Sequence, residues 1–214
     1  MEGGRHVPLL LLNLFAAGKK RETIPLFPLG TVLFPGMLLP LKIFEVRYMD
    51  MAKHCLKEKT PFGVCLIREG AEVGTPAVPE TVGCLATIAE CDMEEVGILK
   101  VVALGHERFR IISTGTTPQG LVMGTIEPLA TEPEVTEVQG LAECSEFLAK
   151  VITGIGPKRF SEPLRFEDAS WVSFRLAEIL PLRNDAKQKL LELTDATLRL
   201  AVLHRFLRQQ NLLA

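Results

Sequence analysis

The chain has 214 residues, of which 47% are hydrophobic and 23% are charged, and its formal net charge is −2. This composition excludes an intrinsically disordered chain and provides enough apolar material for one large domain or two small ones. Residues 1–130 hold 13 basic and 14 acidic residues, and residues 131–214 hold 11 and 12. Because nucleic-acid-binding proteins usually present a positive surface, this balance disfavours nucleic acid as a partner.

Residues 1–22 are predicted to be an N-terminal extension. The apolar run Val7–Ala17 is eleven residues long, too short for a membrane span, which needs about 20 residues. Its length fits the hydrophobic part of a signal peptide, but Glu2 offsets Arg5 before the run and the basic residues follow it. The alternative is a segment that lies on the domain or is disordered. We expect no membrane association and a cytoplasmic location.

Between residues 23 and 130, short apolar stretches alternate with Gly and Pro, which is typical of a β-rich domain. One helix, Phe44–Lys57, interrupts the strands, and Glu69–Thr81 is predicted to be a long loop. In the strand that begins at Arg108, arginines alternate with apolar residues, so Arg108 is expected on an exposed or groove face, where such a side chain is usually solvated. The predicted strands are Ile24–Leu26, Thr31–Phe34, Leu38–Ile43, Phe62–Arg68, Cys84–Cys91, Ile98–Leu104, Arg108–Ser113 and Leu121–Glu127.

Residues 128–137 have no apolar periodicity and are interpreted as an acidic linker with solvated carboxylates. After this segment the pattern becomes helical, and residues 131–214 are predicted to be an α-helical bundle subdomain. Gly and Pro end the first predicted helix near residue 154. The first helix is predicted from the spacing of Leu141, Cys144, Leu148 and Val151, and the second is predicted to begin at an Asp168 cap and to end at Leu180. The third is predicted from a capping box formed by Asp185 and Gln188. The fourth is predicted from a Thr194 cap, with Leu198, Val202, Arg205 and Phe206 along one side.

The chain contains no sequence signature of an enzyme. P-loop, GxGxxG, GxSxG and HExxH motifs are absent, and the four histidines lack metal-ligand spacing. His54 and Cys55 are neighbours on the predicted helix and point about 100° apart, which argues against a catalytic pair. The five cysteines form no CxxC pair and are interpreted as free, largely buried thiols of a reducing compartment. We therefore expect no catalytic residue, no metal and no cofactor.

The most distinctive stretch is Ile24–Tyr48, IPLFPLGTVLFPGMLLPLKIFEVRY. It resembles the opening of the N-terminal substrate-binding domain of Lon-type ATP-dependent proteases, a module also found in cereblon, whose pattern runs LFPL-x-x-VLFPG-x-x-LPL-x-IFE-x-RY. The likeness continues in order to about residue 210. The further matching segments are Phe62–Val64, Glu72–Gly74, Gly83–Ile88, Gly105–Ile111 and Lys187–Glu192 with Asp195 and Arg199.

This resemblance implies a PUA-like, β-rich pseudo-barrel over residues 23–130 followed by the helical bundle, an α+β fold that agrees with the periodicity. It also implies a stand-alone, non-catalytic protein that binds unfolded polypeptide or a protein partner, as an adaptor or in quality control. An RNA-binding module is the alternative, because PUA-like folds elsewhere bind RNA, and an enzyme with an unrecognised site is a third possibility. The oligomeric state stays open.

The candidate binding residues come from the signature segment and from the strand near residue 108. For the Phe34–Gly36 turn, a structural role outweighs ligand contact, because Pro fixes φ and Gly permits a positive φ. The residues at the start of the predicted helix are interpreted first as its anchor. Trp171, the only Trp, is expected in the bundle core, and a peptide-binding surface is expected to be an apolar patch or a sheet edge. The candidates are Phe34, Pro35, Met37, Phe44, Glu45, Arg47, Tyr48 and Arg108.

Overall fold

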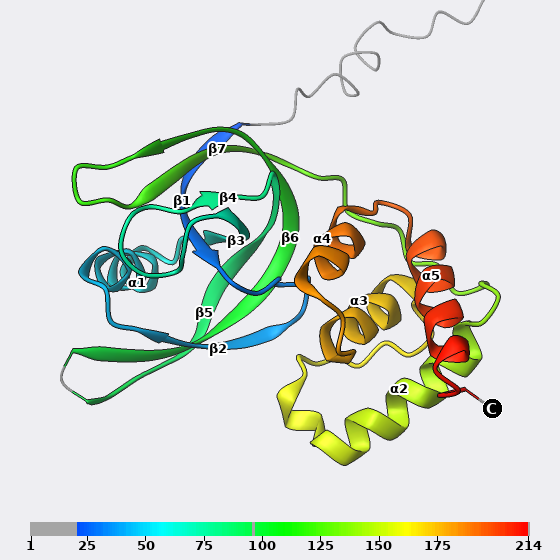
Figure 1. The fold of residues 1–214 in the computed structure, drawn as a ribbon. Helices are drawn as coiled ribbons and strands as arrows, with labels where there is room; N and C mark the ends of the chain where they lie inside the picture. Colours follow the sequence, from blue (N-terminus) through cyan, green and yellow to red (C-terminus); the bar gives the residue numbers. More distant parts are fainter. Residues whose placement is uncertain (1–20, 96, 214) are drawn as a thin grey trace, which may run out of the picture.

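The structure, a computed structural model, describes residues 21–95 and 97–213, in which a β-rich part precedes a helical part (Figure 1). The β-rich part contains β1 (Glu22–Leu29), β2 (Leu38–Ile43), α1 (Val46–Glu58), β3 (Phe62–Glu69), β4 (Val78–Pro79), β5 (Val82–Glu95), β6 (Ile98–Thr116) and β7 (Val122–Pro128). The helical part contains α2 (Leu141–Ile155), the short 3-10 helix η2 (Pro157–Arg159), α3 (Ala169–Ile179), α4 (Asn184–Glu192) and α5 (Ala196–Gln209).

Five strands form a closed ring. In the order β1, β7, β6, β5 and β3, each strand pairs with the next in antiparallel fashion, and β3 returns to β1 in parallel. Strand β2 lies outside this ring and, within the described residues, pairs only with the first half of β6. The side chains inside the ring come from all five strands and form a small apolar core. A second apolar core lies between the outside of the ring, β2 and α1. The β-rich character agrees with the sequence pattern, whereas the assignment to the PUA-like class stays a prediction.

The observed strands correct the predicted ones at two places. The predicted strand Thr31–Phe34 is irregular, because Val32 and Phe34 pack against the helical part while Leu33 packs into the core around α1. The predicted break near Gly105 is also wrong, since β6 is one continuous strand. Gly105 instead permits close contact, because a Cβ atom there would lie 2.3 Å from the Phe34 carbonyl oxygen.

The other strand predictions agree with the structure apart from their ends. Strand β2 has the predicted bounds, and β3 extends the predicted strand by one residue. The predicted loop Glu69–Thr81 also contains β4, which pairs with β3. Of the predicted extension, residues 1–20 lie outside the described residues, including the run that could be a signal peptide, and Glu22 is the first residue of β1.

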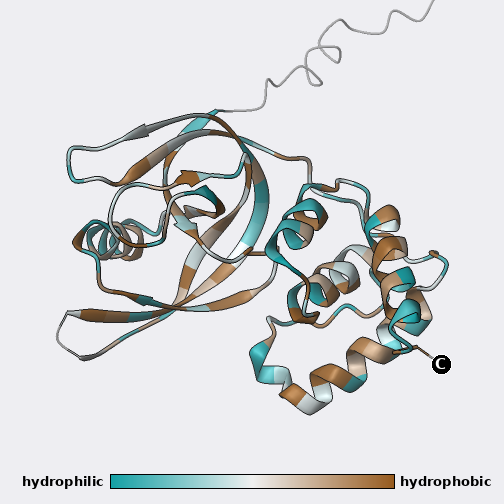
Figure 2. Ribbon diagram, in the orientation of Figure 1, coloured by the Kyte–Doolittle hydropathy of each residue, from teal (hydrophilic) through white to brown (hydrophobic). Residues whose placement is uncertain are grey.

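The helical part lies on one side of the strands, with α1 on the opposite side (Figure 1). Helix α3 contacts α2, α4 and α5, and apolar residues alternate with polar ones along α2 and α5 (Figure 2). Residues of the β-rich part, among them Val32, Phe34 and Val82, belong to the same apolar cluster as the helices. The two parts therefore share a core, and the division near residue 130 stays a prediction.

The helix starts show which predicted caps are used. The Asp168 carboxylate accepts a hydrogen bond from the Ser170 amide at 2.9 Å, as the sequence predicts. The Thr194 cap is wrong, because Asp195 caps α5 by accepting from two amides. The capping box at Asp185 is also wrong, because Arg183 is the N-cap residue of α4 and the Gln188 amide group donates to the Val82 carbonyl at 3.0 Å. Within residues 21–95 and 97–213, none of the helices has the length and hydropathy that a membrane span requires.

Candidate functional site

The candidate residues divide between two hollows in the surface. Pro35 and Arg108 line a cleft of 420 Å³ between the strands and the helical part. Phe44, Glu45 and Tyr48 line a separate groove of 320 Å³ beside β2. The sequence candidates therefore do not form one site, and the two hollows differ in their chemistry.

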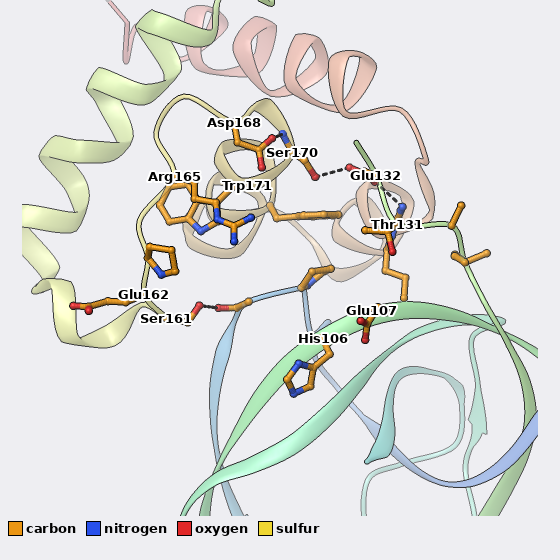
Figure 3. A pocket seen from close by; sticks show the side chains of 17 residues that line it. His106, Glu107, Thr131, Glu132, Ser161, Glu162, Arg165, Asp168, Ser170 and Trp171 are labelled. Carbon is orange, nitrogen blue, oxygen red and sulfur yellow. Dashed lines mark hydrogen bonds and ion pairs between the residues drawn. The ribbon is translucent and has the colours of Figure 1, made fainter. Parts of the chain in front are cut away.

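The cleft opens between β6 and α3 (Figure 3). His106 and Glu107 come from β6, Arg165 comes from the segment before α3, and Trp171 comes from α3. Trp171 is only partly buried and packs edge-on against Phe166, with ring centroids 5.4 Å apart. It therefore lies at the edge of the helical core and forms one wall of the cleft.

A buried ionic cluster closes the inner end of the cleft. The Glu132 carboxylate accepts hydrogen bonds from Arg108 at 2.6 Å, from Arg199 at 2.9 and 2.5 Å, and from the Ser170 hydroxyl at 2.6 Å. The Arg199 guanidinium also lies 3.7 Å from the centroid of the Phe174 ring. The side chains of Arg108, Glu132 and Arg199 are 4%, 6% and 0% exposed. The cluster joins β6, the segment after β7 and α5, and it leaves little of these charges for a ligand.

Two predictions about these charges are wrong. Arg108 is buried rather than solvated, and Glu132 is not one of the solvated linker carboxylates. Burial alone would raise the pKa of Glu132, but the hydrogen bonds and charges of Arg199, Ser170 and Arg108 outweigh it and lower that pKa below its ordinary value. Burial lowers the pKa of Arg108, which the charge of Glu132 partly offsets. The pairing explains how two arginines and a glutamate can be buried together.

The Phe34–Gly36 turn is held from the helical part. The guanidinium of Arg175, fully buried, donates to the carbonyls of Gly36 and Pro35, both at 2.6 Å, and the Ser161 hydroxyl donates to the Gly36 carbonyl at 2.6 Å. Gly36 has a φ of 74°, which a residue with a side chain rarely adopts. Phe34 is fully buried. These contacts give the turn a structural role in docking the two parts.

The groove beside β2 is lined by apolar and charged side chains and has exposed apolar residues at its rim. Its lining comes from β1, β2, the start of α1 and the loop after β3. Phe44 and Val73, which both line the groove, are 53% and 56% exposed. Strands β1 and β2 face each other across this groove without any hydrogen-bonded pairing between them in the described residues. A hollow with uncovered large apolar side chains is typical of a surface that binds another chain.

The polar candidates beside this groove anchor α1. The Arg47 guanidinium forms an ion pair with Glu45 at 2.7 Å, donates to the Gly120 carbonyl at 3.0 Å and lies 4.9 Å from the centre of the Tyr48 ring. The Tyr48 ring stacks on Phe27 with centroids 4.1 Å apart. These contacts agree with the anchoring role inferred for this motif and leave Phe44 as its exposed member.

Comparison with known proteins identifies the family. The family model described as the ATP-dependent protease La (LON) substrate-binding domain matches residues 23–209 of the chain. The chain belongs to this family. The Lon protease of Paraburkholderia phytofirmans is 28% identical over 191 residues, which cover 84% of this chain and 23% of that protein. Protein cereblon of Danio rerio is 27% identical over 115 residues, which cover 50% of this chain and 26% of that protein.

Solved structures agree with this membership. A Lon N-terminal domain protein from Xanthomonas campestris superposes with a TM-score of 0.72 and 30% identity, over 85% of this chain and 96% of that one. The N-terminal domain of a Mycobacterium avium complex Lon protease gives a TM-score of 0.64 at 21% identity, over 85% and 96% of the two chains, and so shows the fold alone. The chain spans about a quarter of the length of the curated relatives it matches. Membership therefore supports a role in substrate recognition, and no ATPase or protease domain is matched.

In this Lon substrate-binding domain, the signature segment contributes residues to both hollows, and the sequence pattern did not distinguish the two surfaces. Met37 packs against the core of the helical part and against the core around α1, so it joins the two parts and lines neither hollow. Val73 is the groove residue that sequence reasoning missed, because it lies in a loop without periodicity. Glu132 was visible only as one carboxylate among several in the acidic segment. Its partners Arg108 and Arg199 lie far from it in the chain, and no sequence pattern links the three residues.

Four of the five cysteines are buried and poorly suited to nucleophilic chemistry. Burial raises the pKa of Cys84 and that of Cys144 to about 12 and raises the pKa of Cys55 and Cys65 as well. Cys91 is exposed, in contrast to the other four thiols. His54 is exposed whereas the neighbouring Cys55 is buried, so the two side chains lie on different sides of α1. In the part of the chain that the structure describes, no three His, Cys, Asp or Glu side chains form a cluster that could hold a metal ion.

Proposed function

We propose that this domain recognises protein substrates by holding an apolar segment of unfolded polypeptide, or of a protein partner, in the groove between β1 and β2. The domain acts by binding, without a catalytic step, as an adaptor or in quality control. The observation that carries the proposal is the exposure of the apolar side chains of Phe44 and Val73 at the rim of this groove. Covering them with a ligand removes their apolar surface from water, which favours association.

The environment of Phe44 supports this function. Its neighbours Glu45, Arg47 and Tyr48 are occupied with one another and with the body of the domain. Phe44 is therefore presented from a fixed helix start rather than from a loose loop, and Val46, two residues on, is 72% exposed. A rigid frame lowers the entropy lost when a ligand is ordered against it.

The absence of a catalytic step rests on the chemistry of the described residues. The buried thiols have raised pKa values, and thiolates rather than thiols are the reactive form. The carboxylate of Glu132 is held by two arginines, which suits a structural ion cluster better than proton transfer. These features favour a binding role over the third possibility, an enzyme with an unrecognised site.

The test is a titration of a fluorescently labelled, permanently unfolded polypeptide, followed by anisotropy. We expect saturable, salt-tolerant binding, and we expect the double variant Phe44→Ser, Val73→Ser to bind at least about tenfold more weakly, since each lost apolar contact contributes about 1–2 kcal/mol. The matched control is Leu198→Ser, Val202→Ser on α5, because these two residues are 50% and 48% exposed and lie outside the groove.

The outcomes separate the possible functions. Equal weakening by both double variants would show that nonspecific apolar surface, not the groove, binds the polypeptide. Single-stranded RNA is titrated in parallel, and salt-sensitive binding of RNA without binding of polypeptide would favour the RNA-binding alternative. Binding of neither would contradict recognition of unfolded chains and direct attention to a folded partner.

A further inference from the structure

We infer that the bound segment adds to the free edge of β2 as a further β-strand, and that it carries an acidic residue opposite Lys42. This inference rests on the proposed function and specifies how the groove between β1 and β2 is used. It concerns the backbone groups of β2, whereas the candidate residues were selected for their side chains. A strand added to a sheet edge is held by main-chain hydrogen bonds, so it tolerates many sequences, as recognition of unfolded chains requires.

The pairing of β2 leaves one edge available. Antiparallel register joins Leu38 to Leu104 and Ile43 to Leu99, and β6 is the only partner of β2 within residues 21–95 and 97–213. The amide of Gly105 donates to the carbonyl of Met37 at 2.9 Å. In an antiparallel pair, successive residues direct their N–H and C=O groups to opposite sides. The odd-numbered residues of β2 therefore face β6, and Leu38, Pro40 and Lys42 direct their backbone groups away from it.

Pro40 fits this assignment. Proline has no N–H group and is found on edge strands where the missing donor would point away from the sheet. The free edge thus offers the amides of Leu38 and Lys42 and the carbonyls of all three residues. These groups repeat every second residue, a spacing of about 6.6 Å that only an extended chain can match. Pro40 and Lys42 also line the groove, so an added strand can place alternate side chains beside Phe44 and Val73.

The charges beside the edge indicate which sequence is preferred. Lys42 is in register with Lys100 on β6, and Lys100 is in turn in register with Asp92 on β5, so Lys42 is the outermost charge of this row. Of the carboxylates that line the groove, Glu45 is engaged by Arg47, and Glu72 accepts from the Gly30 amide at 2.5 Å. Within the described residues Lys42 forms no ion pair and is exposed. An acidic residue on an added strand, opposite Lys42, complements this charge.

The experiment uses synthetic ten-residue peptides in which Val and Leu alternate with Thr around one central Glu. Two peptides carry N-methyl groups on alternate backbone amides, one set on the odd and the other on the even positions. Methylation removes donors from one edge of the peptide strand only. We expect one set to weaken binding by at least about tenfold and the other to have little effect, because each set blocks a different edge. Amide hydrogen exchange of Leu38 and Lys42 is expected to slow on binding, while exchange of Leu39 and Leu41 changes little.

A second arm tests the charge. The variant Lys42→Glu is expected to bind the Glu-containing peptide about threefold or more weakly and to prefer a peptide with central Lys, whereas Lys42→Arg keeps the original preference. The exposed Lys53 on α1 provides the control variant Lys53→Glu. If the parent peptide binds and Phe44→Ser weakens it, but both methylated sets bind equally well, strand addition is overturned and the proposed function stands. If no peptide or unfolded chain binds, the proposed function itself fails.

Discussion

The cleft and the groove are two hollows that differ in which side chains are buried and paired. In the cleft, charged side chains from both parts of the molecule are buried and paired with one another, around Arg108, Glu132 and Arg199. In the groove, apolar side chains stay exposed, and no segment among the described residues covers them. The cleft thus holds the two parts together, whereas the groove has the character of a surface that receives another chain.

The difference also shows where sequence likeness is informative. The signature segment passes through both regions, and its members near Phe34 serve the docking of the two parts while Phe44 lies at the groove. One motif therefore serves the fold near Phe34 and contributes Phe44 to the proposed binding surface. Variants in the cleft are expected to change the stability of the domain, whereas variants in the groove are expected to change binding.

The largest effect is expected for Glu132→Ala. Removing the carboxylate leaves Arg108 and Arg199 buried without their counter-charge, and breaking a buried ionic cluster in this way costs about 3–5 kcal/mol. Urea unfolding should show this loss in the free energy of unfolding. The control Glu134→Ala, an exposed carboxylate of the same segment, should change that free energy by less than about 0.5 kcal/mol. Similar values for the two variants would mean that the cluster does not stabilise the junction.

A smaller loss is expected for Gly105→Ala. The added Cβ atom would lie 2.3 Å from the carbonyl oxygen of Phe34, so the turn that connects to the helical part would have to shift, at a cost of about 1–3 kcal/mol. Gly115 lies on the same strand, and a Cβ atom added there would meet nothing within 4 Å, so Gly115→Ala is the matched control. Thermal unfolding measures both. A Gly105→Ala domain as stable as the control would contradict the tight crossing of the segment before β2 over β6.

These two positions also show how far the sequence could be interpreted. Period-2 and helical patterns were sufficient for β2 and α2, because burial there follows the local period, whereas β3 is buried over five consecutive residues. They failed at Thr31–Phe34, because its apolar residues are divided between two cores, and at Gly105, because a glycine that admits a neighbouring carbonyl looks the same as one that ends a strand. The cluster of Arg108, Glu132 and Arg199 joins residues far apart in the chain, and no local pattern records such pairing.

The dependence of stability on pH gives a third, smaller effect. The pKa of Glu132 lies below its ordinary value of 4.5 in the folded domain. The ionised carboxylate therefore stabilises the fold at pH values above the unfolded pKa, and this contribution is lost as the pH falls through the lower, folded value. Stability measured between pH 6 and pH 3 should decline less steeply for Glu132→Gln than for the parent domain. An identical slope for the two proteins would show that Glu132 does not titrate with unfolding.

The smallest expected effect is an unchanged fluorescence of Trp171, which distinguishes binding in the groove from binding in the cleft. Trp171 is the only Trp in the sequence and lies in the wall of the cleft, so its fluorescence reports on the cleft and not on the groove. Binding of the unfolded polypeptide in the groove should leave the emission maximum of Trp171 unchanged while the anisotropy of the label rises. The Phe44→Ser, Val73→Ser variant provides the control, since it should lose the anisotropy change and keep the same emission. A blue shift of Trp171 on binding, retained in that variant, would mean that the polypeptide enters the cleft, because covering an indole removes it from water. The ionic cluster would then be the floor of the binding site rather than a closure between two parts.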